Sequence, residues 1–429
     1  MITRRELMRA LSRHKVSDWV VIERTQDLAI ADAVRTTRRR ENRTRIGLVV
    51  HHDDSRGRGS ARLEIAGHED DASAVVDQAI SLAIAAVGPS WKSVPPAAPA
   101  QVQLFDQKLA KRDLADVAAE LALHMRRPQG AKVEAAAQVM VERVEVSSQS
   151  GLTTRWTASE LVVEALVSAH DRSLAIRRSA RREADLDLDG GIAAAVADLG
   201  SLADATPAVP GRCALVMTAE AFLHGDTPAG VWSVFAAQAD SVLERQGLTR
   251  YRVGAPVASG ATELDEPLTI TSDGARDYAL RSAPLGDDGD AVRRFPLVER
   301  GVAKGLGLST REAALRQRDP NGGVRNLVVA PGTWDALLPA VGARGALPRT
   351  IEVRRLRALS LDPFTGDASL ELALAVEHAG ANRRAFLGGT IRLDLITALA
   401  RARRSAATVE RNGYAGPVAI LIEDAELLA

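Results

Sequence analysis

The sequence predicts an α+β protein, in which an N-terminal half of helices and antiparallel β-meanders precedes a strand-rich C-terminal half with a mixed or antiparallel sheet. Segments with alternating or clustered apolar residues follow one another, without the strand–helix–strand alternation of a dinucleotide-binding fold. Two stretches rich in Pro and Ala, PSWKSVPPAAPAQ and ATPAVPGR, interrupt them. We therefore predict an N-terminal α+β domain at 1–207, with a linker at about 89–101, and a C-terminal β-rich domain at 208–429.

The N-terminal half contains the same group of predicted elements twice. Helices are expected at 3–13, 71–87, 114–125 and 190–204, and antiparallel meanders with strand-like segments at 18–36, 44–54, 60–67 and 132–182. The helix at 71–87 is amphipathic and ends at Gly88 and Pro89. The two groups share no sequence identity, so the order of their elements alone suggests an internal repeat.

The C-terminal half is dominated by predicted strands. Strand-like segments lie at 213–218, 266–274, 291–307, 324–332, 349–380 and 417–427, and helices are expected at 335–341 and 392–404. The continuous apolar run at 417–422 predicts a strand inside a sheet.

Composition excludes several classes of protein. Lys and Arg number 55 and Asp and Glu 55, and aromatic residues make up only 3%, which argues against a nucleic-acid partner. With Cys213 as the only cysteine, neither a disulfide within the chain nor a four-cysteine zinc site can form. There is neither a signal-like N-terminus nor an apolar run near the ~18 residues of a membrane span, so we expect a cytoplasmic protein without a membrane partner.

The histidines form no convincing metal-binding pattern. His224 opens the segment HGDTPA, in which glycine follows the histidine and Pro228 interrupts any helix, so a capping or surface role is favoured over a ligand. His51 and His52, in HHDD, would point to opposite faces of a strand, which favours a polar hairpin end over a shared ion.

An acidic turn, LGDDGD, is the most distinctive polar feature of the C-terminal half. Asp287, Asp288 and Asp290 precede a predicted hairpin that begins with Arg293 and Arg294. These acids either cap the loop, which the sequence favours, or face a cleft that binds a cation or a peptide amine. Asp287, Asp288, Arg293 and Arg294 are the candidate peptide-cleft residues.

The longer stretch around this turn, PLGDDGDAVRRFPLVERGVAKGLGLSTREAALR, resembles the TldD/PmbA (TldE) family, once called modulators of DNA gyrase. RTRIGLVVHHDDSRGRGSA near the N-terminus, and GGTIRLDLITALARA and GYAGPVAILIEDAEL near the end, resemble further family motifs in the same order. The resemblance therefore spans almost the whole chain.

The resemblance implies a cytoplasmic heterodimer that acts as a metalloprotease on unfolded or small peptides, including antibiotic precursors. In that family the TldD-like subunit binds zinc through an HExxxH motif and a distant cysteine, while the TldE- or PmbA-like subunit lacks these ligands. Aligned with HExxxH, HGDTPA keeps the first histidine as His224 but has Gly225 in place of the glutamate and Ala229 in place of the second histidine. The resemblance thus implies a non-catalytic subunit without a cofactor of its own, zinc in a TldD-like partner, and a peptide substrate.

Two other functions stay open at this stage. One is a stand-alone peptide-binding or chaperone-like protein that presents a precursor peptide to other enzymes, which the absence of a TldD-like partner would favour. The other, binding to nucleic acid or gyrase, follows only from the older family name, and the neutral charge argues against it.

Overall fold

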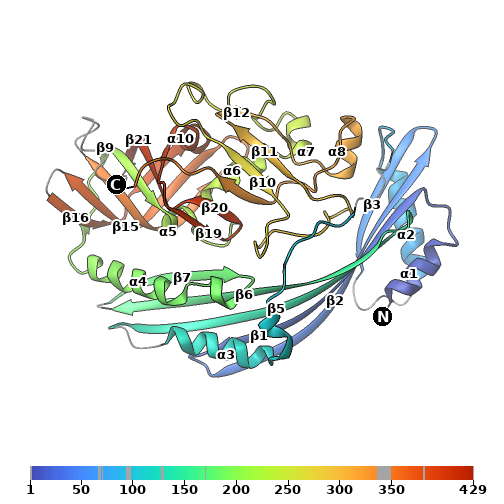
Figure 1. Cartoon of the computed structure of the whole chain (residues 1–429), viewed down its shortest axis with the longest axis horizontal. Helices are drawn as coiled ribbons and strands as arrows, with labels where there is room; N and C mark the ends of the chain where they lie inside the picture. The colour runs from blue at the N-terminus through green and yellow to red at the C-terminus, as the bar shows by residue number, and fades with distance from the viewer. Residues whose placement is uncertain are drawn as a thin grey trace.

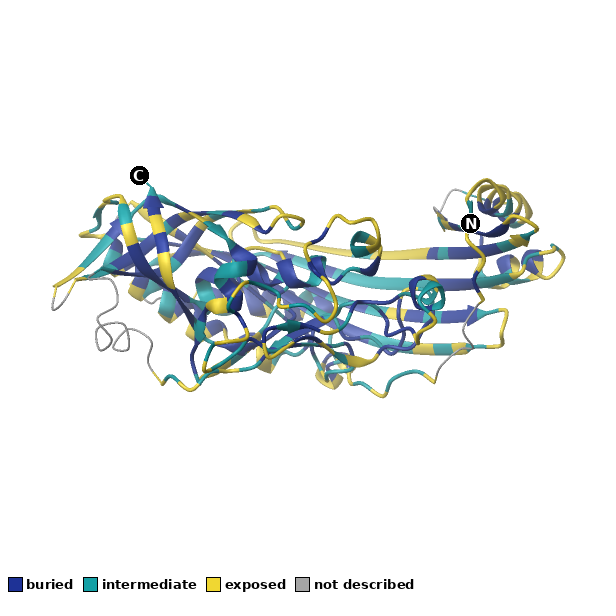
Figure 2. Cartoon of the chain, turned by 90° about the horizontal axis from the view of Figure 1, so that it is seen from above, coloured by how far each residue is buried: buried dark blue, intermediate teal, exposed yellow. Residues whose placement is uncertain are grey.

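The computed structural model describes residues 2–65, 69, 71–92, 98–126, 130–169, 171–335, 349–379 and 382–428. A long curved antiparallel sheet forms one layer, and a β-rich C-terminal body lies against its concave side (Figure 1). Seen from above, the sheet extends beyond this body toward the N-terminal helices (Figure 2). The helix expected at 335–341 falls outside the described residues, apart from its first position.

The seven-stranded sheet joins the two predicted meanders edge to edge. Its order is β4-β3-β2-β1-β5-β6-β7, and β1 pairs antiparallel with β5. The strands are β1 (Asp18–Asp32), β2 (Thr37–Asp54), β3 (Gly57–Ile65), β4 (Val87–Gly88), β5 (Lys132–Ser148), β6 (Thr153–Ala169) and β7 (Arg172–Ala180). The strand β7 forms one edge of this sheet, and β4 forms the other.

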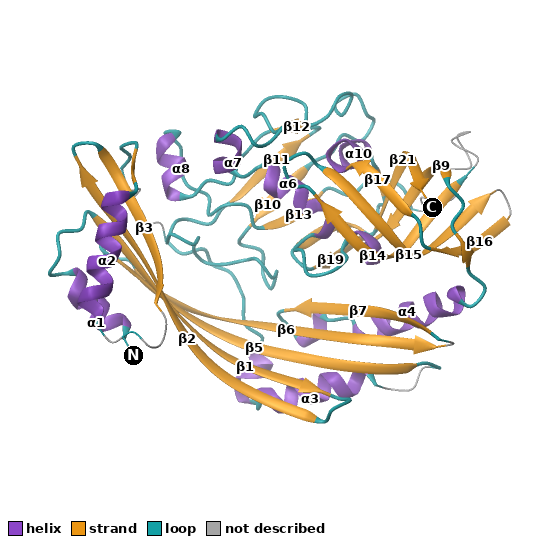
Figure 3. Cartoon of the chain, turned by 180° about the vertical axis from the view of Figure 1, so that it is seen from behind, coloured by secondary structure: helices purple, strands orange, loops and turns teal. Residues whose placement is uncertain are grey.

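Four helices accompany this sheet, α1 (Arg4–Leu11), α2 (Ala72–Ala85), α3 (Leu114–Met125) and α4 (Leu188–Leu202). The helices α1, α2 and α3 lie on its convex side (Figure 3). Along β1, Val21, Ala29 and Ala31 belong to the cores under the helices, whereas Val20 and Ile22 pack against Leu285 of the C-terminal body. Successive side chains of a strand point to opposite faces, so the sheet buries apolar residues on both sides.

The C-terminal body contains two further sheets and several short helices. The first sheet has the order β14-β9-β21-β17-β15-β16-β8, and an additional β14–β15 pairing closes five of its strands into a small barrel. Its strands are β8 (Thr206–Pro207), β9 (Gly211–Thr218), β14 (Thr350–Leu361), β15 (Asp367–Ala379), β16 (Asn382–Leu387), β17 (Thr390–Asp394), β18 (Arg403–Arg404) and β21 (Ala419–Leu428).

The second sheet has the order β12-β11-β10-β13-β20-β19. Its strands are β10 (Ile270–Asp273), β11 (Arg294–Glu299), β12 (Val302–Ala303), β13 (Asn326–Val329), β19 (Thr408–Arg411) and β20 (Tyr414–Pro417). The described helices of this half are α5 (Ala219–Phe222), α6 (Ser233–Gln238), α7 (Ser241–Arg245), α8 (Thr310–Leu315) and α10 (Leu395–Arg401), with the 3₁₀ turn η3 (Gly230–Trp232). Two further 3₁₀ turns, η1 (Gln107–Lys111) and η2 (Glu183–Asp185), belong to the N-terminal half.

The predicted α+β class is confirmed, with an antiparallel sheet and helices first and mixed strand-rich sheets second. The four N-terminal helices lie where helical periodicity places them. The sequence does not predict α5 to α8, because segments of four to six residues are too short to show a periodic apolar pattern. Near the proposed domain boundary, β8 pairs in parallel with β16 of the C-terminal body.

Candidate functional site

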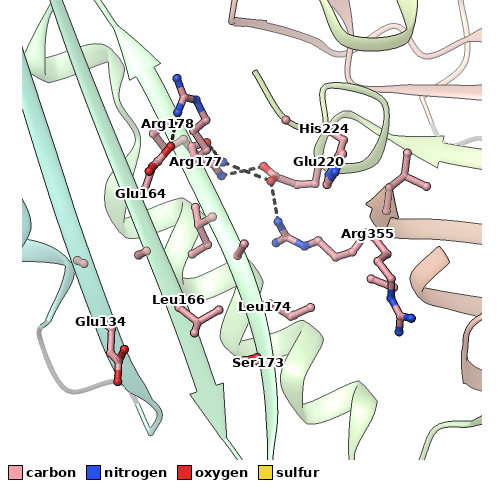
Figure 4. A pocket seen from close by; sticks show the side chains of 18 of the residues that line it. Glu134, Glu164, Leu166, Ser173, Leu174, Arg177, Arg178, Glu220, His224 and Arg355 are labelled. Carbon is pink, nitrogen blue, oxygen red and sulfur yellow. Dashed lines mark hydrogen bonds and ion pairs between the residues drawn. The ribbon is translucent and has the colours of Figure 1, made fainter. Parts of the chain in front are cut away.

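A hollow with a volume of about 1030 Å³ lies between the two layers. On one side it is lined by β7 and by residues of β5 and β6, and on the other by the segment around Glu220 and His224, by β14 and by the turn after β19. Figure 4 shows Arg178 of β7 and Arg355 of β14 converging on Glu220 at this cavity. We refer to it below as the interlayer cavity.

The HGDTPA segment enters this cavity as a loop. The short helix α5 ends at Phe222, and Gly225 has a φ of +73°. Ala229 is buried with a φ of +61°, and its N–H donates to the carbonyl of Asn412 over 2.7 Å. The Asn412 side chain donates in turn to the carbonyl of Thr227 over 3.1 Å. The segment is therefore fixed to the β19–β20 turn in a conformation that no metal-binding helix adopts.

His224 lines the cavity and is half-buried. Burial lowers the pKa of its ring, and among the described residues the ring has no hydrogen-bond or ion-pair partner. The neutral form of the imidazole therefore predominates at pH 7. Asp226, two residues later, is exposed and pairs with Arg177 over 2.9 Å.

Glu220 is surrounded by three guanidinium groups. It accepts hydrogen bonds from Arg178 (2.8 Å), Arg355 (2.9 Å) and Arg411 (2.6 Å), which belong to β7, β14 and β19. Burial raises the pKa of Glu220, but the charges of Arg411, Arg178 and Arg355 outweigh this effect and hold the pKa at about 2. Such a carboxylate is fully ionised near neutral pH and too weakly basic to take a proton from water.

The same cluster connects the two layers. Arg355 also donates to Asp198 of α4 over 2.8 Å, so one buried arginine holds carboxylates from both halves of the chain. A Cβ on Gly191 of α4 would lie 2.9 Å from the Arg178 guanidinium, so a larger residue there would require this guanidinium to shift. We refer to Glu220, Asp198, Arg178, Arg355 and Arg411 as the Glu220 cluster.

The residues around His224 do not fit a zinc ion. Zinc needs three or four converging N, O or S ligands. Here the carboxylate of Glu220 is held by arginines, and within the described ranges no three His, Cys, Asp or Glu side chains are grouped closely enough to hold a metal. Burial raises the pKa of Cys213, on β9, to about 11, so it stays a thiol.

The acidic turn lies against the long sheet, away from His224. The carbonyl of Asp287 accepts from Arg62 of β3 over 2.7 Å, and the carboxylate of Asp288 pairs with Arg62 over 3.1 Å. Asp287 also pairs with Arg325 over 3.4 Å. Leu285, just before the turn, packs in a small apolar core with strand residues of the sheet. The acidic turn therefore lies where the C-terminal body contacts the long sheet.

Arg293 and Arg294 lie beside a different hollow, of about 570 Å³, which Phe295 and Lys304 also line. Arg293 pairs with Asp319 over 3.0 Å and Arg294 with Asp273 over 3.9 Å. Of the sequence-selected residues, the structure brings His224 and Gly225 to the interlayer cavity, buries Ala229 next to it, and places the acidic turn and its two arginines elsewhere. A role of the turn in binding peptides stays a prediction.

The HHDD segment ends β2 at a hairpin. His51 is buried, its ring hydrogen-bonds Ser60 over 2.8 Å, and it meets the Trp91 ring edge-on. Burial, together with the charge of Arg58, lowers the pKa of His51 to about 4. The ring is therefore a neutral packing group at pH 7.

Asp290 of the acidic turn gives a testable stability effect. Burial, and the nearby charge of Asp288, raise its pKa from 3.8 to about 6. Since the folded state disfavours the ionised form, wild-type stability decreases as pH rises from about 4 to about 6. We expect Asp290→Asn to remove this slope and to raise the free energy of unfolding at pH 7 by up to about 3 kcal/mol, measured by urea unfolding at several pH values. Asp287→Asn, at an exposed carboxylate, is the control and should change stability by less than about 1 kcal/mol; equal effects would contradict the assignment.

Sequence reasoning missed Arg178, Arg355, Arg411 and Asp198. They stand on separate elements of both halves, so no spacing connects them, and the sequence contains many other arginines. Only the pairing of β7 within the long sheet and of β14 within the barrel brings them to Glu220.

Comparisons with known proteins agree with the fold. Residues 219–427 match the family model of the PmbA/TldA metallopeptidase C-terminal domain. TldE from Thermococcus kodakarensis has a similar structure (TM-score 0.74, 16% identity, 99% of each chain covered). Two proposed modulators of DNA gyrase are also similar, one from Thermotoga maritima (TM-score 0.76, 15% identity, 99% of this chain and 98% of that one) and one from Bacteroides thetaiotaomicron (0.79, 13%, 100% and 99%). No curated protein sequence matches the chain.

Proposed function

From the match of residues 219–427 to the PmbA/TldA metallopeptidase C-terminal domain and from the fold that the whole chain shares with a TldE, we propose that this chain is the non-catalytic, TldE-like subunit of a two-chain zinc metallopeptidase that acts on unfolded or small precursor peptides. The observation that carries the proposal is the conformation of HGDTPA. Gly225 and Ala229 stand where the family resemblance expects a base and a second ligand, in a loop fixed to the β19–β20 turn.

The chemistry of the cavity supports the absence of a hydrolytic centre in this chain. Activation of water needs a bound metal or a base with a pKa near the working pH. His224 lacks an orienting partner among the described residues, and three arginines hold Glu220 at a pKa of about 2. We therefore assign the zinc and the hydrolytic step to a TldD-like partner with an intact HExxxH motif.

The cavity also supports a role in enclosing the substrate. Its volume, about 1030 Å³, is at the upper limit of the ~300–1000 Å³ of small-molecule pockets and would hold a short peptide.

Within the described chain no helix is long and apolar enough to cross a bilayer.

A cleavage assay with purified chains tests the proposal. The TldD-like partner, this chain and an equimolar mixture are each incubated with an unfolded peptide, and products are followed by mass spectrometry. We expect cleavage by the mixture, little by the partner alone and none by this chain. A mixture in which the partner carries Gln in place of its motif glutamate is the control and should be inactive.

Each other outcome has a definite meaning. If the partner cleaves equally well without this chain, the subunit role is wrong. If this chain cleaves by itself, the non-catalytic assignment is wrong. If it binds peptide but neither associates with nor stimulates the partner, the stand-alone peptide-binding function replaces the proposal.

A further inference from the structure

The interlayer cavity has more positive than negative charge at its centre. In the Glu220 cluster, the guanidinium groups of Arg178, Arg355 and Arg411 face only the carboxylates of Glu220 and Asp198. Arg172 and Arg357 also line the cavity, are exposed, and have no ion pair with a described residue. The described lining as a whole has seven arginines and five carboxylates, so an excess of positive charge remains for a ligand.

Two buried donors of the cluster also lack an acceptor. Arg178 and Arg355 are more than nine-tenths buried, yet Nε of Arg178 and Nη2 of Arg355 have no hydrogen-bond partner among the described residues. A buried N–H without an acceptor is unfavourable. Both arginines belong to the cavity wall, and an anionic oxygen is the acceptor that best complements a guanidinium group.

The shape of the cavity favours an extended ligand. The whole of 172–179 in β7 lines it, and within the described residues this strand pairs on one side only, with β6. Ser173, Ala175 and Ser179 are small and leave room along the strand. A peptide in extended conformation fits such a wall.

From these observations we propose that the interlayer cavity binds the carboxylate of an extended peptide, either an acidic side chain or a free C-terminus, through Arg357 and Arg172 at its surface and the Glu220 cluster at its base. The peptide nature of the ligand rests on the proposed function, whereas the preference for a carboxylate rests on the arginines alone. This chain would thereby select acidic precursor segments.

The test measures binding to this chain alone by fluorescence anisotropy. One labelled peptide has a central Glu and a free C-terminus, a second has Gln and a C-terminal amide, and two more carry one carboxylate each. We expect the peptide with both carboxylates to bind about tenfold more tightly than the neutral one, with the gap narrowing at higher ionic strength. The two single-carboxylate peptides identify which carboxylate the site takes.

Exposed arginines allow variants that keep the fold. Arg357→Gln and Arg172→Gln should each weaken binding of the acidic peptide severalfold and leave the neutral peptide unchanged. Arg392→Gln, at an exposed arginine of β17 outside the cavity lining, is the matched control and should bind like wild type. Thermal unfolding of each variant confirms that it is folded.

Equal affinity for acidic and neutral peptides, or no loss in Arg357→Gln and Arg172→Gln, would overturn the proposal. Inorganic phosphate that competes as well as the acidic peptide would overturn the assignment to a peptide carboxylate. Since no partner is present, these results are independent of the cleavage assay. A chain that binds acidic peptides but does not stimulate the partner refutes the subunit role alone.

Discussion

Glu220→Gln is expected to lower the free energy of unfolding at pH 7 by about 3 kcal/mol, because it leaves buried arginines without their central carboxylate. The difference between a folded pKa of about 2 and the ordinary value of 4.5 gives the same magnitude. The side chain is 25% exposed, so solvent screens these ion pairs only in part. Urea unfolding of wild type and variant measures the change.

The pH dependence separates this ionic effect from simple loss of packing. A lowered pKa stabilises the fold above pH 4.5, and the contribution disappears as pH falls from 4.5 toward 2. The difference in unfolding free energy between wild type and Glu220→Gln should therefore begin to narrow below about pH 4.5 and be nearly closed at about pH 2. Glu426→Gln, at an exposed carboxylate of β21 without an ion pair among the described residues, is the control and should stay within about 0.5 kcal/mol of wild type. A gap that persists at low pH would refute the ionic origin.

Gly230→Ala is expected to destabilise the C-terminal body by about 4 kcal/mol or more. Gly230 has a φ of +53°, and an added Cβ would lie 1.9 Å from the carbonyl oxygen of Phe222 and 2.7 Å from the Cα of Leu223. Both contacts are with backbone, so only a shift of the loop could relieve them. That shift would disturb Phe222, whose ring packs against Trp232 and Tyr414 in the core.

Gly225→Ala is the matched control for this substitution. Gly225 also has a positive φ, +73°, but an added Cβ would have no atom within 4 Å. The left-handed conformation alone should cost about 1 to 2 kcal/mol. Differential scanning calorimetry of the two variants should show a much larger decrease in Tm for Gly230→Ala. Similar decreases would indicate that backbone strain, and not the close approach to Phe222, limits this position.

The sequence predicts well those parts of the fold in which burial repeats at short range. The alternating burial of β5 and the amphipathic α3 can be read directly from their residues. The start of β2 could not, because its first nine residues, 37–45, are arginine-rich and mostly exposed and show no apolar alternation. They form a strand because β1 provides backbone partners along this length.

The candidate site shows the same limit more strongly. The family resemblance selected His224, Gly225 and Ala229, and two of these three line the interlayer cavity. Glu220, four residues before His224, could not be selected from the sequence, because the arginines that bind it come from strands of both halves of the chain. The acidic turn attracted attention by composition, yet its charges mainly meet arginines of neighbouring elements.

The Glu220 cluster also has a consequence for how the chain is synthesised. Arg178 leaves the ribosome 42 residues before Glu220, and Arg411 follows Glu220 by 191 residues. The strands of the long sheet can pair early in synthesis. The guanidinium group of Arg178, on the edge strand β7, lacks the carboxylate of Glu220 until α5 is made. Glu220 in turn lacks its third arginine, Arg411, until β19 is made. The Glu220 cluster can therefore be completed only after β19 has been made, and a fragment that stops before β19 would lack one of its three arginines.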